Sequence, residues 1–221
     1  ALLVVDNTFT TPAMFRPMQH GADIVINSIT KFLAGHSDVT LGYVAARDPG
    51  LRTAIYEAAV TWGTTPSPFD CWLAERGLHT FDLRFEKAQA TAAALADALA
   101  GRDGIRQVIY PGRADHPHHN RAGTLFGGQF GNMLSFEIEG GRDEVNSFVM
   151  NAGGIPFAPT LGDVGCTLSH PASSSHRALT TEGRAALGIS EGYFRLSVGI
   201  EPPELVLAEL DAALAAVRGE S

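Results

Sequence analysis

The feature that most constrains the fold is the segment at residues 23–38, which reads D-I-V-I-N-S-I-T-K-F-L-A-G-H-S-D. It begins with a short β-branched run at residues 24–26, and the polar residues Ser28, Thr30 and Lys31 follow at once. An apolar run of this kind predicts a buried parallel strand. Ligands bind at the carboxyl ends of such strands. The segment therefore predicts an α/β fold in which one strand delivers Lys31 to a binding site.

Lys31 has two interpretations when its neighbours are ignored. A lysine just after a strand is commonly a solvated surface cation. Alternatively, burial at a strand end favours the neutral amine of a lysine, which forms an imine with an aldehyde cofactor. The flanking hydroxyls of Ser28 and Thr30, beside backbone N–H groups, suit a phosphate monoester. A second apolar run, at residues 2–5, ends at Asp6, whose carboxylate can hold a pyridinium nitrogen protonated. Together these residues favour the cofactor interpretation.

These residues lie within two longer motifs, V-D-N-T-F-T-T-P and G-A-D-I-V-I-N-S-I-T-K-F-L-A-G-H-S-D. The pair, and above all the spacing S-x-T-K-x-x-x-G-H-S-D, resembles the Cys/Met-metabolism (transsulfuration) family of pyridoxal phosphate enzymes. The resemblance covers nearly the whole chain, because it continues through S-P-F-D-C-W-L-A-E-R-G-L, Y-P-G-R-A-D-H-P-H-H, T-L-G-D-V-G-C-T-L-S-H-P-A-S and F-R-L-S-V-G-I-E.

The resemblance implies a cofactor, pyridoxal 5′-phosphate, and a role for each residue near the strand ends. Lys31 would carry the cofactor covalently and act as the catalytic base. Asp6 would pair with the pyridinium nitrogen, Thr8 would lie against the ring, and Ser28 and Thr30 would hold the phosphate.

Arg195 lies in a predicted strand between Phe194 and Leu196, where a guanidinium needs an anionic partner. The residues alone leave open an internal salt bridge, for example to Glu201, or a bound anion. The match to R-L-S-V-G favours the α-carboxylate of an amino-acid substrate, which a guanidinium binds through two parallel hydrogen bonds. The resemblance also places Thr160 near that carboxylate.

We expect no metal site. His116, His118 and His119 are close in sequence, but Pro117 stiffens their loop and the spacing is poor for one metal. The resembled family has the same loop without a metal. Cys166 has no adjacent histidine or lysine that would activate its thiol, so we interpret it as a packing residue.

Composition excludes several classes of function. The 221 residues carry a net charge of -8 with a pI near 5.4, which argues against nucleic acid or anionic membranes as partners. No apolar stretch approaches the ~20 residues of a membrane helix. The two cysteines, Cys71 and Cys166, are far apart in sequence and fit a reducing compartment. We therefore expect a soluble, cytoplasmic protein.

The pattern along the chain predicts two parts. The resemblance implies that residues 1–77 are the back part of a fold-type I (aspartate aminotransferase-like) large domain, and that residues 78–221 are a small C-terminal α+β domain. We expect strands at 41–46, 108–110, 133–138 and 194–198, and helices from 68 to an interruption at Gly77 and over 81–99, 145–150 and 205–217. The helix at 81–99 would bridge the two domains, and residues 218–221 would fray.

The chain begins on a strand without a starting Met, so we expect the back half of a longer protein, a homo-oligomer (a dimer of dimers) when complete. The resemblance implies making or breaking of C–S bonds in small-molecule amino acids, with γ-elimination favoured. The alternatives are a cystathionine γ-synthase, an O-acyl-homoserine sulfhydrylase, or, as another class, an incomplete fragment that cannot retain cofactor alone. Gly165 and Cys166 stand where many related enzymes have E-S, which makes a cystathionine-only preference less expected.

Overall fold

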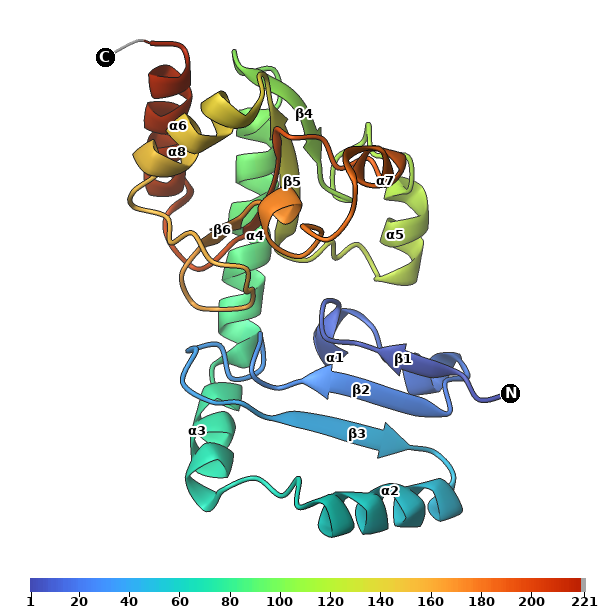
Figure 1. The fold of residues 1–221 in the computed structure, drawn as a ribbon. Coiled ribbons are helices and arrows are strands. Elements are labelled where there is room, and N and C mark those ends of the chain that lie inside the picture. The colour runs from blue at the N-terminus through green and yellow to red at the C-terminus, as the bar shows by residue number, and fades with distance from the viewer. Residues whose placement is uncertain (220–221) are drawn as a thin grey trace.

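The computed structural model describes residues 1–219 and has two parts that are joined by one long helix. The first part contains a three-stranded sheet with the order β1-β2-β3, and the second contains a four-stranded sheet with the order β4-β5-β7-β6. In Figure 1 the helix α4 (Phe81–Leu99) runs from the lower part into the upper one. The expected α/β architecture is therefore confirmed.

The first sheet contains the predicted parallel strand. Its strands are β1 (Val4–Asp6), β2 (Ile24–Ser28) and β3 (Gly42–Ala46). Strands β1 and β2 are parallel, whereas β3 runs antiparallel to β2. Burial along β2 alternates, because Val25 is 4 % exposed and Ile26 is 39 % exposed. The strand predicted to be buried is therefore parallel to β1 as expected, but only alternate residues of it are buried.

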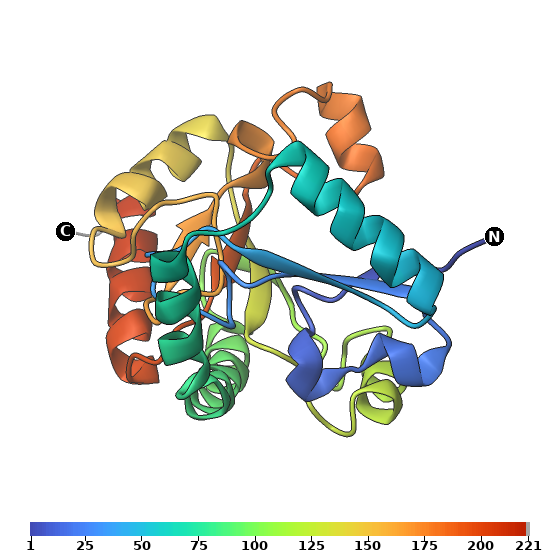
Figure 2. The same cartoon turned by 90° about the horizontal axis from the view of Figure 1, so that it is seen from below.

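Short helices connect and flank this sheet. The link from β1 to β2 holds only α1 (Thr11–Met14) and the 3₁₀ helix η1 (Pro17–His20). Helix α2 (Pro49–Trp62), which was not expected from the sequence, lies along β3 in the view from below (Figure 2). Helix α3 (Pro68–Leu78) begins as expected, because the Ser67 hydroxyl accepts a hydrogen bond from the Asp70 amide at 3.1 Å.

Helix α3 ends at Leu78, one residue after the expected interruption at Gly77. Gly77 is buried inside the helix. A Cβ atom at position 77 would lie 2.4 Å from the carbonyl oxygen of Ala34. The glycine is there because the helix packs directly against the backbone that follows Lys31.

Helix α4 contributes to two hydrophobic cores. The predicted apolar positions are all buried: Phe81, Phe85, Ala88, Ala92, Leu95 and Leu99. Phe81 and Phe85 pack with Phe32, Leu33 and Leu161 in a small core. The later turns of the helix belong to the large core of the second part. The division at 77/78 stays a prediction, and α4 links the two sides of it.

The second sheet is antiparallel throughout. Its strands are β4 (Ile105–Ile109), β5 (Met133–Ile138), β6 (Thr167–Ser169) and β7 (Tyr193–Ser197). The helices around it are α5 (His119–Leu125), α6 (Arg142–Asn151), η2 (Pro171–Ser173), α7 (Thr181–Ala186) and α8 (Pro203–Val217). The expected strands and helices are confirmed within a few residues at each end, whereas β6, α5 and α7 were not expected.

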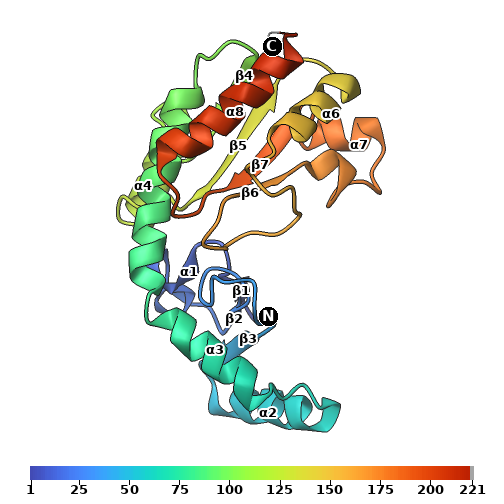
Figure 3. The ribbon, with the colours of Figure 1, turned by 90° about the vertical axis from the view of Figure 1, so that its left-hand side faces the viewer.

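Side-chain alternation gives this sheet one apolar and one polar face. Leu134, Phe136, Phe194 and Leu196 belong to the large core, together with residues of α4, α6 and α8. Figure 3 shows these three helices along the sheet. The intervening residues of the strands face the other way. Arg195 is one of them, and it therefore lies on the face away from the helices.

Arg218 follows directly after α8, and its Nη1 donates a hydrogen bond to the Asp103 carbonyl oxygen at 3.1 Å. Of the tail expected to fray, residues 220 and 221 lie outside the described part of the chain.

Candidate active site

The strand ends bring together the first group of expected site residues. Asp6 ends β1 and Ser28 ends β2, and these strands are parallel neighbours, so both residues lie at the same edge of the sheet. Lys31 lies in the turn just after β2, where its amide donates to the Ser28 carbonyl oxygen at 3.2 Å and its own carbonyl accepts from the Gly35 amide at 2.8 Å. The turn therefore fixes the Lys31 backbone close to the strand end.

Thr8 connects the two strand ends. Its amide donates to Oδ1 of Asp6 at 2.9 Å, and its hydroxyl oxygen accepts from the Ser28 amide at 2.9 Å. Thr8 is buried, whereas the Asp6 side chain is exposed. Three of the expected cofactor residues thus form one hydrogen-bonded series with a carboxylate at its outer end.

Thr30 is engaged in a different way from the one expected. Its hydroxyl donates to the Leu41 carbonyl oxygen at 3.1 Å and accepts from the Leu41 amide at 2.9 Å. The hydroxyl hydrogen is therefore directed to the backbone. To donate to a phosphate, this hydroxyl would have to turn away from Leu41. Its role at a phosphate stays a prediction.

Lys31 meets the second part of the chain at Thr160. Its Nζ atom donates to the Thr160 hydroxyl oxygen at 2.9 Å, although 129 residues separate the two in sequence. The Thr160 carbonyl oxygen accepts from Nη2 of Arg195 at 2.8 Å. The structure therefore brings the expected lysine, threonine and arginine together, and the half-buried Lys31 is not a freely solvated surface cation.

Among residues 1–219, Arg195 has no carboxylate partner. Glu201, the candidate for an internal salt bridge, instead accepts hydrogen bonds from Cys166, at 2.6 Å from its amide and 3.2 Å from its thiol. In the sheet, Arg195 lies opposite Ser135 on one side and Ser169 on the other. Within residues 1–219 the structure records no ion pair for Arg195.

The guanidinium of Arg195 has the environment of an anion-binding group. Its Nε atom is buried and has no hydrogen-bond partner among the described residues. Burial lowers the pKa of Arg195, because the charged form loses hydration. A buried charge without a partner is costly, and a planar ligand with two oxygens satisfies a guanidinium best. The geometry thus fits a bound carboxylate beside Lys31.

Gly162 lies beside the candidate site and was not predicted from the sequence. Its amide donates to the Ser197 hydroxyl oxygen at 3.0 Å, and it has φ +82. A Cβ atom there would lie 2.6 Å from the Phe32 amide nitrogen and 2.9 Å from the carbonyl carbon of Lys31. The segment that carries Thr160 therefore rests directly on the turn that carries Lys31. The signal was the T-L-G motif, whose glycine follows Thr160 by two positions.

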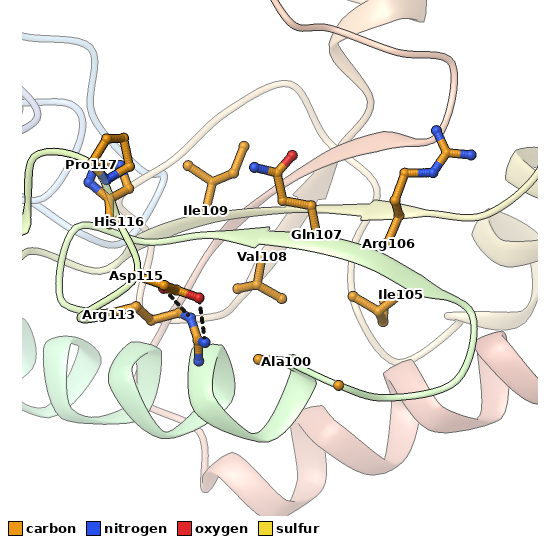
Figure 4. A pocket seen from close by; sticks show the side chains of 11 residues that line it. Ala100, Ile105, Arg106, Gln107, Val108, Ile109, Arg113, Asp115, His116 and Pro117 are labelled. Carbon is orange, nitrogen blue, oxygen red and sulfur yellow. Dashed lines mark hydrogen bonds and ion pairs between the residues drawn. The ribbon is translucent and has the colours of Figure 1, made fainter.

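A separate pocket of about 480 Å³ lies beside the edge strand β4 and the loop that follows it (Figure 4). Arg113 and Asp115 form an ion pair in this loop at 2.8 Å. His116 lines the pocket, and burial lowers its pKa, with a smaller effect in the same direction from His118. Lys31, Thr160 and Arg195 are not among the lining residues, so this pocket is not the candidate site.

Over residues 1–219 we find no group of three or more histidine, cysteine or acidic side chains arranged to hold a metal ion. Nor does any helix in that range have the length and apolar character to span a membrane.

Comparison with known proteins identifies the family. Residues 1–215 match the Cys/Met metabolism PLP-dependent enzyme family. The chain belongs to this family. It is 42 % identical over 213 residues to the cystathionine β-lyase of Bacillus subtilis (strain 168), covering 96 % of this chain and 54 % of that protein. It is 40 % identical over 214 residues to the cystathionine γ-lyase of Dictyostelium discoideum, covering 97 % and 55 %.

A solved structure gives the same result for the fold. The cystathionine γ-synthase of Xanthomonas oryzae pv. oryzae, in complex with aminoacrylate and cysteine, superposes with a TM-score of 0.93 at 45 % identity, over 100 % of this chain and 57 % of that one. The resemblance to the family and the back part of a fold-type I large domain are thus confirmed. The chain spans about half the length of the relatives that it matches.

Enzymes of this family use pyridoxal 5′-phosphate, and the residues present fit that group. Lys31 offers an amine, Asp6 an exposed carboxylate at a strand end, and Ser28 a half-buried hydroxyl beside it. The unpaired Nε atom of Arg195 would be satisfied by the carboxylate of an amino-acid substrate.

Proposed function

We propose that this chain carries the covalent lysine and the substrate-carboxylate site of a PLP-dependent enzyme that makes or breaks C–S bonds of sulfur amino acids. The observation that carries the proposal is the connected series of Lys31, Thr160 and Arg195, which ends in a half-buried guanidinium whose buried Nε atom has no partner among the described residues. Family membership supports the cofactor and the class of substrate.

Each residue has a role that follows from its chemistry. Pyridoxal phosphate, when bound, supplies an aldehyde that reacts with amines and a ring that takes up electrons from carbon. Lys31 would hold it and, once released, would move the proton at the substrate Cα atom. Asp6 would keep the ring nitrogen protonated, with Thr8, Ser28 and Thr30 around the cofactor. Arg195 and Thr160 would orient the substrate through its α-carboxylate.

We propose γ-elimination as the reaction, with cystathionine, methionine and homocysteine as substrates. Its support is the space at Gly165, where an added Cβ atom would meet only Oε1 of Glu201, at 3.5 Å. A glycine offers no charge to the distal amino group of cystathionine, so selectivity for that substrate should be low. The alternatives are β-elimination, and replacement at Cγ by a γ-synthase or sulfhydrylase.

The variant Gly165→Glu tests the choice of substrate. It should raise the ratio of kcat/KM for cystathionine to that for methionine, because the new carboxylate can pair with the distal ammonium. Both specificity constants are measured in the full-length protein. An unchanged ratio, or a wild type that only joins sulfide to homoserine esters, would refute the proposed substrate range.

An alternative interpretation is that this chain is an incomplete fragment that cannot retain the cofactor alone. Lys31 and the exposed Lys87 are the only two lysines of the chain, which makes a labelling experiment decisive. The full-length protein and this chain are each mixed with pyridoxal phosphate, reduced with borohydride and mapped by mass spectrometry. We expect the label on Lys31 in the full-length protein, its loss together with activity in Lys31→Ala, and no change in Lys87→Ala.

A label on Lys87 would overturn the assignment of Lys31. A label in the full-length protein but not in the isolated chain would support the fragment interpretation. We also propose that the complete protein is a cytoplasmic homo-oligomer, for which the acidic composition and family membership are the only support.

A further inference from the structure

Arg84 makes an unusual set of contacts to the turn that carries Lys31. Its Nη1 donates to the Phe32 carbonyl oxygen at 2.9 Å, and its Nη2 donates to the carbonyl oxygens of Leu33 at 3.0 Å and Gly77 at 2.9 Å. Its Nε donates to the Thr80 hydroxyl oxygen at 3.0 Å. Phe32 and Leu33 directly follow Lys31, so one side chain of α4 binds the backbone of the lysine turn to the end of α3.

The turn is packed so closely that side chains are excluded on the side facing Arg84. Gly35 has φ +75, and a Cβ atom there would lie 2.0 Å from Nη1 of Arg84. On the adjoining side, Gly77 in α3 leaves no room for a side chain against Ala34. The guanidinium therefore occupies the position that a side chain at residue 35 would otherwise fill.

The opposite side of the turn is held by the segment after Thr160. The Val164 amide donates to the Gly35 carbonyl oxygen at 2.8 Å, and the Ser37 hydroxyl donates to the Asp163 carboxylate. Burial lowers the pKa of Arg84, and the negative charge of Asp163 partly opposes that effect. The turn is thus held between α3, α4 and the 160–164 segment.

Arg84 does not have the surroundings of a ligand-binding residue. The crevice beside it, lined by Phe32, Gly162 and Asp163 among others, has a volume of about 10 Å³. That is at the lower limit for one water molecule. The donors of its guanidinium are used by three backbone carbonyls and one hydroxyl. Its contacts are therefore to the protein itself.

We propose that Arg84 is a positioning residue: it fixes the turn at residues 31–35 so that Nζ of Lys31 meets Thr160 and the substrate site. The role at Lys31 rests on the proposed function, whereas the rigidity of the turn does not. Without the guanidinium, the carbonyls of Phe32 and Leu33 lose their donor, whereas that of Gly77 keeps its hydrogen bonds from Thr80. The turn is then no longer tied to α3 and α4 through these bonds and no longer has a single favoured position. Lys31 would then reach its reacting position in only a fraction of molecules.

The test compares Arg84→Met with Arg102→Met in the full-length protein. Arg102 is a matched control, because it also joins two elements, with Nε donating to the Ala98 carbonyl oxygen at 3.0 Å and an ion pair to Asp211 at 2.8 Å, but it does not touch the turn. Amide hydrogen exchange is measured without cofactor. The reporters are the amides of Gly35 and Val164, which donate within and onto the turn, and that of Phe136 in the large core.

We expect Arg84→Met to accelerate exchange at Gly35 and Val164 roughly tenfold or more, the effect of losing charged hydrogen bonds, and to leave Phe136 unchanged. It should also lower kcat with little change in KM, and slow borohydride trapping on Lys31. Arg102→Met should change neither the turn amides nor the trapping rate. If Arg84→Met does not fold, Arg84→Lys takes its place, since an ammonium cannot serve three carbonyls in the same geometry.

If the amides of Gly35 and Val164 exchange at the wild-type rate in the Arg84 variant, the proposal is wrong. It is also wrong if the exchange rate rises equally at Phe136. A different result would separate the two proposals. If Arg84→Met accelerates exchange at the turn but borohydride never traps Lys31, even in the wild type, then the role of Arg84 in holding the turn is supported and the proposed function is refuted. The two failures are thus distinguishable.

Discussion

Replacing Gly77 by alanine should destabilise the protein, although helix propensity alone predicts the opposite. Alanine is better than glycine inside a helix by about 1 kcal/mol. At position 77, however, the new Cβ atom would lie 2.4 Å from the oxygen and 2.8 Å from the Cα atom of Ala34. These are backbone atoms, which cannot rotate away as the end of a side chain can.

The magnitude follows from these opposing effects. Overpacking of a tight contact costs about 1–3 kcal/mol, and more when the neighbour cannot move. The Ala34 backbone belongs to the turn held by Arg84, so we take the upper part of this range. After subtracting the gain in helix propensity, Gly77→Ala should lower the free energy of unfolding by about 2 kcal/mol.

Gly123→Ala provides the matched control. Gly123 also lies inside a helix, α5, but there a Cβ atom would meet only the ring of Phe130, at 3.7 Å, which is an ordinary contact. This variant should gain about 0.5–1 kcal/mol. Urea unfolding of the full-length protein without cofactor measures both. A midpoint that rises in Gly77→Ala as it does in Gly123→Ala would refute the close packing of α3 against the lysine turn.

The remaining predictions concern Arg195 and Cys166. Arg195→Lys should raise KM about 10–100-fold with little effect on cofactor binding, the loss expected when an ammonium replaces a two-pronged guanidinium; an unchanged KM would move the carboxylate site to the backbone near Thr160. Burial raises the pKa of the Cys166 thiol from 9.0 to about 12, so iodoacetamide at pH 8 should label the exposed Cys71 and spare Cys166. The Cys166 thiol ionises at a lower pH in the unfolded protein than in the folded one, so its contribution to stability is complete below pH 9.0 and falls as the pH rises toward about 12. Over this pH range the urea midpoint should therefore fall less in Cys166→Ala than in the wild type.

Local patterns in the sequence predicted much of this fold. The β-branched run before Ser28 predicted β2, and the three- and four-residue spacing of apolar residues predicted α4. These signals succeed because one side of each element is buried, so its periodicity is visible. Helix α2 has no buried residue and therefore shows no such pattern. Strand β6 has only three residues, too few for alternation to be seen.

The sequence predicted which residues meet at the candidate site, but not all of their hydrogen-bond partners. The motifs identified Lys31, Thr160 and Arg195, and the structure brings them together. No periodicity predicts that the Thr30 hydroxyl is engaged by Leu41, or that Arg84 binds the backbone after Lys31, because both contacts depend on how distant segments pack. The end of α3 near Gly77 was predicted, but the packing of this glycine against the backbone of Ala34 was not, because that contact also involves a distant segment.

The surroundings of Arg195, with Ser135 and Ser169 opposite it in the sheet, have a practical consequence for the choice of buffer. A guanidinium that has no carboxylate partner among the described residues attracts small oxyanions, both carboxylates and sulfate, from the medium. Acetate, citrate and sulfate should therefore compete with amino acids at this position and make affinities appear weaker than they are. Titrations in a cationic amine buffer with chloride as the counter-ion would keep this competition low.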